Sequence, residues 1–298
     1  MARPLISFIL GLGKPVGPTR VDGDAVDVDG GQLFAESGGA GPQAIVLLHD
    51  GLIDGSGFDA MWPRLCRDFR VVRYDRRGYG KSPAARGPYS QIDDLAAVIA
   101  SANLERFSLV GFSAGGAIAL DYALDHPQSV ERLILVGAAP GGASPSAAAT
   151  RRENRNFLPI LFGNVQGVAA NWAKDPWYIS RGDDAAKAKA LAIWRSHPQN
   201  IRHLPVDPAR PSPPALPRLP GLRVPMLLVV GDQDFPDILA NTLSAQALIP
   251  NAKRLVVAGA GHALQLERPQ QTADLIGDFV RGGRYRRDDA PQIAVKSG

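Results

Sequence analysis

The chain has 298 residues, of which 45% are hydrophobic, so it can fill the core of one large domain or two small ones. This composition excludes intrinsically disordered and fibrous proteins. The 33 Lys and Arg residues exceed the 29 Asp and Glu residues by only four, and they are spread along the chain. Because nucleic-acid binding needs a clustered basic face, we expect no nucleic-acid partner. The single cysteine, Cys66, excludes an intramolecular disulfide framework and a zinc site built on a cysteine pair.

Residues 1–23 precede the first regular pattern, and we expect them to form an N-terminal arm. The apolar run at 5–10 follows Arg3 and weakly resembles a signal peptide, but Lys14-Pro15 stands where a small-residue cleavage site would be. No stretch approaches the roughly eighteen apolar residues of a membrane span. We therefore expect a cytoplasmic protein with no integral membrane segment, and secretion is the alternative.

The first half of the chain alternates short apolar runs with helical patterns. A hairpin of strands at 24–28 and 32–35 is expected around Asp29-Gly30-Gly31, where the glycines suit a tight turn. Buried strands are expected at 44–48, 70–74, 107–112 and 132–136, with helices at 90–102 and 114–124. Continuous apolar strands separated by helices predict an α/β protein with a mostly parallel central sheet and helices on both faces.

The alternation resumes late in the chain, after an interruption. Strands are expected at 225–230 and 254–257, and helices at 238–248 and 269–280. Residues 141–221 lie between, beginning with a Gly-rich stretch, passing through a helical pattern at 184–195 and ending in a proline cluster. We interpret them as a helical insertion after the sixth strand, packed over one end of a core formed by 24–140 and 222–281. Residues 282–298 are expected to form a flexible tail.

The strongest chemical signal is Gly111-Phe112-Ser113-Ala114-Gly115, where a buried strand ends and a helix begins. In that context the pentapeptide predicts a nucleophile elbow, whose sharp turn raises the serine hydroxyl above the carboxyl edge of the sheet. The helix N-terminus behind it favours developing negative charge. The alternative is a serine in a Gly-rich turn with no chemistry.

A serine nucleophile needs a base, and the base needs an orienting carboxylate. His262 follows the last strand at the same edge of the sheet, whereas His49 is expected to shape its own loop. The carboxylates after the strand at 225–230 are Asp232, Asp234 and Asp237. Asp232 is expected to brace the turn, Asp234 lies further out in the loop, and Asp237 is held in reserve. The resulting chain order of Ser113, Asp234 and His262 is the order expected of α/β-hydrolases.

With these motifs the chain resembles the α/β-hydrolase fold superfamily over roughly residues 24–140 and 222–281. The resemblance rests on Gly-Phe-Ser-Ala-Gly-Gly at 111–116, the stretch from Tyr74 to Ser82, Gly231-Asp232-Gln233-Asp234 and Gly259-Ala260-Gly261-His262. It implies a structural turn at 74–82, a cap domain at 141–221, and a serine hydrolase that needs no cofactor and no metal. The serine argues against the haloalkane dehalogenases and epoxide hydrolases of this fold, which use an aspartate there.

The sequence departs from the family at the loop that supplies the oxyanion hole. The family usually has His-Gly-x after its third strand, whereas this chain has His49-Asp50-Gly51-Leu52 after the strand expected at 44–48. The resemblance implies oxyanion donors at the N–H groups of Gly51 and Ala114, with Leu52 as the alternative register. Asp50 would hinder an oxyanion unless its side chain points away.

These residues predict hydrolysis of a carboxylic ester or lactone of a small molecule through an acyl-enzyme. The alternatives are a C–C bond hydrolase, a cofactor-free perhydrolase of the haloperoxidase type, and a non-enzymatic receptor that reuses the fold. The residues expected to line the substrate pocket are mostly aromatic: Leu52, Phe112, Trp172, Trp177 and Trp194.

Overall fold

A central sheet of eight strands organises the computed structural model, which describes residues 22–202 and 208–283. The strand order is β1-β2-β4-β3-β5-β6-β7-β8. The strands are β1 (Asp22–Val28), β2 (Gly31–Gly38), β3 (Ala44–Leu48), β4 (Arg70–Tyr74), β5 (Phe107–Phe112), β6 (Val130–Val136), β7 (Met226–Gly231) and β8 (Ala252–Val257). The expected arm, except for its last two residues, and the tail beyond Gly283 lie outside the described residues.

The sheet is antiparallel at one edge and parallel elsewhere. β1 and β2 form the predicted hairpin, and β2 also pairs antiparallel with β4. Every further pair, from β4–β3 to β7–β8, is parallel. The carboxyl ends of these parallel strands therefore meet at one edge, where their following loops can gather.

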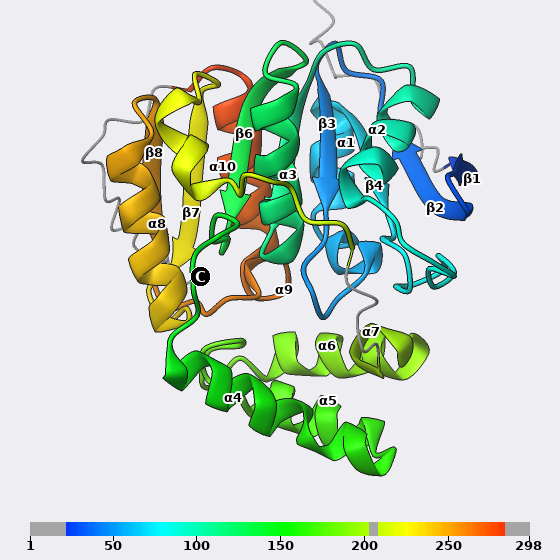
Figure 1. Cartoon of the computed structure of the whole chain (residues 1–298), viewed down its shortest axis with the longest axis vertical. Helices are drawn as coiled ribbons and strands as arrows, with labels where there is room; N and C mark the ends of the chain where they lie inside the picture. Colours follow the sequence, from blue (N-terminus) through cyan, green and yellow to red (C-terminus); the bar gives the residue numbers. More distant parts are fainter. Residues whose placement is uncertain (1–21, 203–207, 284–298) are drawn as a thin grey trace, which may run out of the picture.

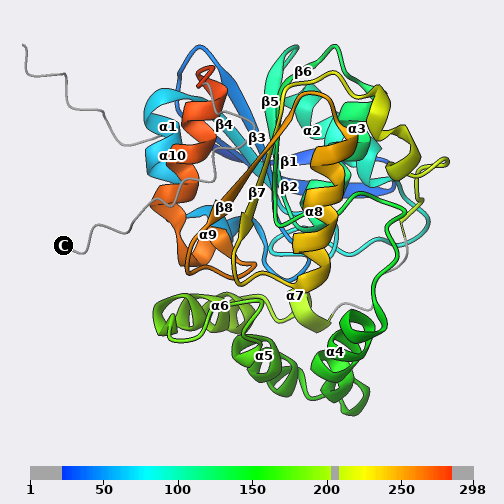
Figure 2. The same ribbon diagram turned by 90° about the vertical axis from the view of Figure 1, so that its left-hand side faces the viewer.

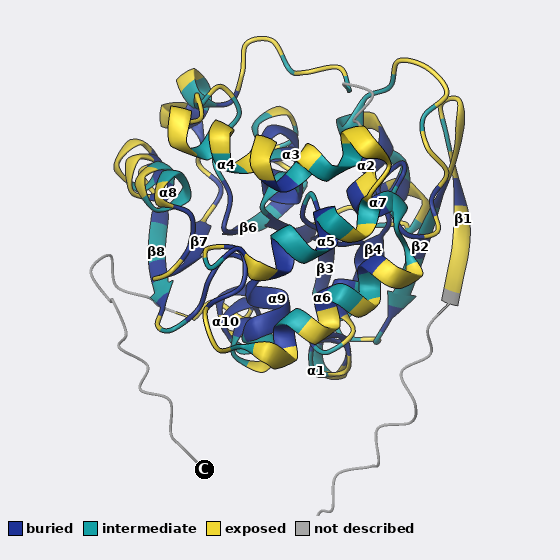
Figure 3. Cartoon of the chain, turned by 90° about the horizontal axis from the view of Figure 1, so that it is seen from below, coloured by how far each residue is buried: buried dark blue, intermediate teal, exposed yellow. Residues whose placement is uncertain are grey.

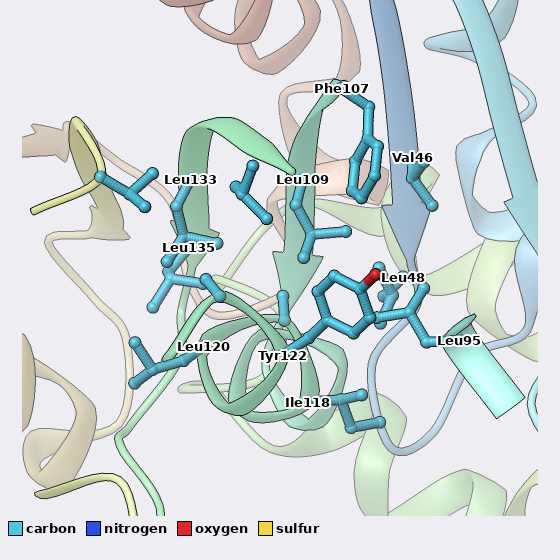
Figure 4. Close-up of a cluster of buried hydrophobic side chains, with 14 of the residues drawn as sticks. Val46, Leu48, Leu95, Phe107, Leu109, Ile118, Leu120, Tyr122, Leu133 and Leu135 are labelled. Atoms are coloured by element: carbon cyan, nitrogen blue, oxygen red, sulfur yellow. The ribbon is translucent and has the colours of Figure 1, made fainter. Parts of the chain in front are cut away.

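Helices cover both faces of the sheet, as the sequence predicted. Figures 1 and 2 show α1 (Trp62–Asp68) and α10 (Pro269–Val280) on one face, with α2 (Gln91–Ser101), α3 (Ala114–Asp125) and α8 (Pro236–Leu248) on the other. Each face has its own buried apolar cluster. Figure 4 shows the cluster on one face, in which Ile118, Leu120 and Tyr122 of α3 are buried together with Leu109 of β5 and Leu135 of β6. This packing fixes α3 against the strand that precedes it.

Between β6 and β7 the chain forms a group of helices, which we call the helical layer. It comprises α4 (Ala147–Phe157), η2 (Leu158–Phe162), α5 (Val165–Lys174), α6 (Asp184–Ser196) and α7 (Gln199–Arg202), together with the segments that join them. A separate apolar cluster holds it together, with Trp172, Tyr178 and Trp194 as its largest members. Figures 1 and 2 show the layer lying beyond one end of the sheet, and Figure 3 shows it from below.

The remaining short helices connect these parts. They are η1 (Gly55–Phe58), η3 (Leu216–Gly221) and α9 (Leu264–Glu267). The proline-rich return from the helical layer thus contains a helical turn that the sequence pattern did not predict. Within the described ranges, no helix is both long and apolar enough to cross a bilayer.

Candidate active site

Ser113 occupies a strained turn between β5 and α3. Its backbone has φ 49° and ψ −115°, a conformation that costs a non-glycine residue on the order of 1–3 kcal/mol. Two glycines permit the turn: a Cβ at Gly111 would lie 2.4 Å from the Gly115 carbonyl oxygen, and one at Gly115 would lie 2.4 Å from that of His49. The packing of α3 holds Ser113 in this strained conformation. The turn projects the serine from the carboxyl edge of the sheet.

His262 and Asp234 form a buried pair at the same edge. His262 follows β8 and is 6% exposed, and Asp234 follows β7 and is 1% exposed. Nδ1 of His262 lies 2.7 Å from Oδ1 of Asp234, which also accepts the N–H of Phe235 at 2.6 Å. A proton on Nδ1 satisfies this contact and leaves Nε2 as the basic nitrogen.

The surroundings of His262 favour its charged form overall. Burial lowers the pKa of His262, but the charge of Asp234 and the hydrogen bond to it raise the pKa, with a further contribution from Asp50. The net pKa is above its ordinary value of 6.5. The pair is therefore suited to accept a proton and hold it.

Gly137, which follows β6, makes room for this pair, and the sequence analysis did not identify it. A Cβ there would lie 3.0 Å from Nδ1 of His262 and 3.2 Å from Oδ2 of Asp234. Its φ of 59° also disfavours any side chain. A glycine directly after a buried strand was the only available signal, and such glycines are common.

One cavity brings Ser113 and His262 together. It has a volume of about 340 Å³ and is also lined by the oxyanion-loop residues Gly51 and Leu52 and by Ala114. Its far wall comes from the helical layer, including Arg152 and Phe157 of α4, Trp172 of α5, and Tyr178. The cavity therefore lies between the carboxyl edge of the sheet and the helical layer.

Asp50 turns its carboxylate into the protein, where four donors surround it. Oδ1 accepts the N–H groups of Leu52 and Ile53 at 2.6 and 2.7 Å. Oδ2 accepts Nε2 of Gln265 at 2.6 Å and the Tyr178 hydroxyl at 3.3 Å. Asp50 thus engages the N–H of Leu52, which is the alternative oxyanion donor.

The two other carboxylates after β7 are engaged elsewhere. Oδ1 of Asp232 accepts the N–H groups of Gly259 and Ala260, so it braces the loop that carries His262. Asp237 accepts the backbone N–H and the hydroxyl of Ser146 at the start of α4. Of the three carboxylates, Asp234 is the one that contacts His262.

The imidazole of His49 is committed to its own loop. Its Nδ1 lies 2.8 Å from the Asp50 carbonyl oxygen, and its Nε2 accepts the N–H of Arg76 at 2.9 Å. Burial, followed by the charge of Arg76, lowers the pKa of His49 to about 3. His49 is therefore neutral with both ring nitrogens occupied.

The expected pocket residues separate into two groups. Leu52 and Trp172 line the cavity with Ser113. Phe112 is instead buried against Phe58, Trp194 donates its indole N–H to the Leu52 carbonyl oxygen, and Trp177 is 38% exposed. Tyr178 and Phe235 contribute aromatic wall that the sequence did not single out.

Glu267 of α9 fastens the His262 loop to the helical layer. Its carboxylate accepts the N–H of Gly261 and the N–H of Ser180, each at 3.0 Å, as well as the Ser180 hydroxyl. The N–H of His262 donates to the Trp177 carbonyl oxygen at 2.8 Å. The helical layer thus fixes the position of His262, which sequence spacing could not indicate.

No group of three or more His, Cys, Asp or Glu residues within 22–202 and 208–283 is arranged to hold a metal ion. The chemistry available at this cavity comes from a serine, an oriented imidazole and backbone N–H groups. Such a set can activate a hydroxyl and stabilise an oxyanion.

Comparisons with known proteins identify the family of the chain. The model of the alpha/beta hydrolase family matches residues 45–275. A pimeloyl-[acyl-carrier protein] methyl ester esterase of Aeromonas hydrophila is 28% identical over 83% of this chain and 99% of its own length. A 2-hydroxy-6-oxononadienedioate/2-hydroxy-6-oxononatrienedioate hydrolase of Paraburkholderia phymatum is 28% identical over 81% of this chain and 88% of its own.

The fold agrees with solved structures as well. The crystal structure of a carboxylesterase of Bacillus subtilis superposes with a TM-score of 0.73 at 21% identity, covering 90% of this chain and 94% of that one. The eight-stranded, mostly parallel sheet with helices on both faces is the fold that the sequence predicted. This chain belongs to the alpha/beta hydrolase family.

Proposed function

We propose that the protein hydrolyses a carboxylic ester or lactone of a small molecule through an acyl-enzyme on Ser113. The observation that carries the proposal is the meeting of a strained serine and an oriented His–Asp pair in one cavity. The esterase named among the relatives supports the same reaction class.

In the proposed mechanism, the Ser113 hydroxyl attacks the carbonyl carbon while Nε2 of His262 takes its proton. The alkoxide leaves with that proton, and a water molecule then attacks the acyl-enzyme with His262 again as base. Asp234 holds the imidazole in one tautomer and stabilises its charged form. The N–H groups of Gly51 and Ala114 bind the oxyanion, each contributing about 10²–10³ in rate in typical cases.

The test is turnover of p-nitrophenyl esters of increasing acyl length and of simple lactones. Wild type should show a burst of p-nitrophenol equal to the enzyme concentration when deacylation is slow, and an alkyl phosphonate should label Ser113 alone. The Ser113→Ala variant is the matched control. If neither turnover nor phosphonate labelling at Ser113 occurs, the proposal is wrong, and saturable binding without product would then favour the receptor alternative.

A C–C bond hydrolase is the second candidate, because one relative bears such a name at 28% identity. It would use the same serine, histidine and aspartate on a vinylogous 1,5-diketone. Comparing kcat/KM for such a diketone with kcat/KM for the best ester separates the two functions.

A further inference from the structure

Arg152 of α4 is an unusual residue in the wall of the cavity. Its side chain is 13% exposed, and its guanidinium carbon lies 4.0 Å from the centre of the Phe235 ring. The centre of the Phe235 ring lies 4.7 Å from the centre of the His262 ring. A nearly buried cation beside the reacting groups needs an explanation, since burying a charge without hydrogen bonds is unfavourable.

The nearest carboxylate, that of Asp175, forms an ion pair with this cation but no hydrogen bond. Oδ2 of Asp175 remains 3.7 Å from Nε of Arg152, too far for a hydrogen bond. The same oxygen accepts Nδ2 of Asn156 at 2.7 Å, and Oδ1 accepts the N–H of Trp177. Nε of Arg152 is buried and has no hydrogen-bond partner among the described residues.

The other acidic groups of the cavity are placed or engaged differently. The carboxylate of Asp50 already has four donors, and Asp237 is held by Ser146. Glu153 also lines the cavity but is exposed. Asp175 therefore offsets part of the charge of Arg152, but none of these acidic groups hydrogen-bonds to the guanidinium that lines the cavity.

The charge of Arg152 also opposes the proposed catalysis when the cavity holds no anion. It lowers the pKa of His262, which disfavours the imidazolium that forms as Ser113 is deprotonated. An anionic group on the substrate would neutralise the guanidinium and remove this penalty. This effect is the smallest of those that set the pKa of His262, whose net value is raised, so it favours an anionic substrate without preventing hydrolysis of a neutral one.

We propose that Arg152 is a specificity-determining residue that binds a carboxylate carried by the substrate, so that the preferred substrates are esters or lactones with a free carboxylate in one half of the molecule. The proposal rests on the hydrolase function proposed above. Arginine suits this role because its planar fork of donors matches a carboxylate, while the rings of Phe235 and Trp177 orient its plane.

The experiment compares charged and neutral substrates of equal length. Monomethyl glutarate and monomethyl adipate place the carboxylate in the acyl half, and butyryloxyacetate places it in the alcohol half. Methyl pentanoate, methyl hexanoate and ethyl butyrate are the neutral references. The readout is the ratio of kcat/KM for each charged substrate to kcat/KM for its reference, measured by product release.

In Arg152→Gln we expect this ratio to fall about 10- to 100-fold in at least one series, the range of one lost hydrogen bond to a charged group. Arg152→Lys should retain part of the preference. Arg151→Gln, which removes the same charge from the adjacent exposed position, should leave the ratio unchanged. A ratio in Arg152→Gln equal to that of wild type in both series would overturn the proposal.

A second measurement uses the wild-type protein, so it tests the carboxylate site even if Arg152→Gln fails to fold. It also separates the carboxylate site from the proposed hydrolase function. Glutarate should inhibit wild-type hydrolysis of methyl pentanoate competitively and much better than glutaramide, and equal inhibition would refute the carboxylate site. If wild type hydrolyses no ester at all, the proposed function fails. Glutarate should even then raise the unfolding midpoint of wild type and not that of Arg152→Gln, and without that difference the carboxylate site fails too.

Discussion

Replacing Asp234 by Asn tests the electrostatic part of the proposed mechanism. In wild type, Oδ1 of Asp234 accepts both Nδ1–H of His262 and the N–H of Phe235. An asparagine at 234 keeps both bonds only if its amide oxygen occupies the Oδ1 position. The Phe235 N–H enforces that choice, so the tautomer of His262 should survive and only the negative charge should be lost.

The expected loss follows from that charge. Two unit charges about 4 Å apart at an effective dielectric constant of about 20 interact by about 4 kcal/mol, which corresponds to about 10³ in rate. Reversal of the tautomer as well would cost up to about 10⁴, as in the serine-protease triad. We therefore expect kcat for Asp234→Asn to fall by about 10³.

The assay is kcat and kcat/KM on a neutral ester from pH 5 to 10, together with the urea unfolding midpoint. Wild-type kcat/KM should rise with pH through an inflection above 6.5, because His262 must be neutral to act as base and its pKa is raised. In Asp234→Asn the inflection should move to lower pH, since burial then acts without its opposing charge. Asp232→Asn, which changes an exposed carboxylate of the same loop, is the control. A loss below tenfold, or one matched by Asp232→Asn, would refute the electrostatic role, and a loss of 10⁴ or more would refute the role of the Phe235 N–H.

Three further substitutions follow from the contacts around the cavity. Ser113→Ala should abolish ester turnover with an unfolding midpoint no lower than that of wild type, because it removes a nucleophile and no core contact; substantial residual turnover would exclude the acyl-enzyme. Asp50→Asn should move the pH inflection of kcat/KM downward, because Asp50 raises the pKa of His262, and should cost about 1–3 kcal/mol of stability by mismatching the donors of Gln265 or Tyr178; an upward shift would contradict this. Glu267→Gln should lower both the urea midpoint and kcat, because both oxygens of Glu267 accept N–H groups and the amide of glutamine supplies only one oxygen. A lower midpoint with unchanged kcat would show that the His262 loop does not depend on Glu267.

Local patterns in the sequence predicted the eight strands, the five longer helices that were expected, and the three residues of the proposed triad, but not α1, α4, α5, α7 and α9. The buried strands at Ala44–Leu48, Arg70–Tyr74 and Phe107–Phe112 were predicted to the residue, because each is a continuous apolar run bounded by polar or turn residues. The helix at Pro269–Val280 was also predicted to the residue, because proline marks its first turn. Ser113, Asp234 and His262 could be named because each follows a parallel strand, and the carboxyl ends of such strands share one edge of the sheet.

Only the tertiary structure decided which contacts the remaining residues make. Asp50, Gly137, Arg152 and Glu267 lie far from one another in the chain, and no local period relates them. The direction of the Asp50 carboxylate depends on Gln265, which lies 215 positions away. Leu52 and Trp172 line the cavity and Phe112 does not, because the packing of the elements decides which side chains face the cavity. A strand or a helix follows from the order of neighbours in sequence, whereas the lining of a site follows from how separate elements pack, and packing is a property of the whole fold.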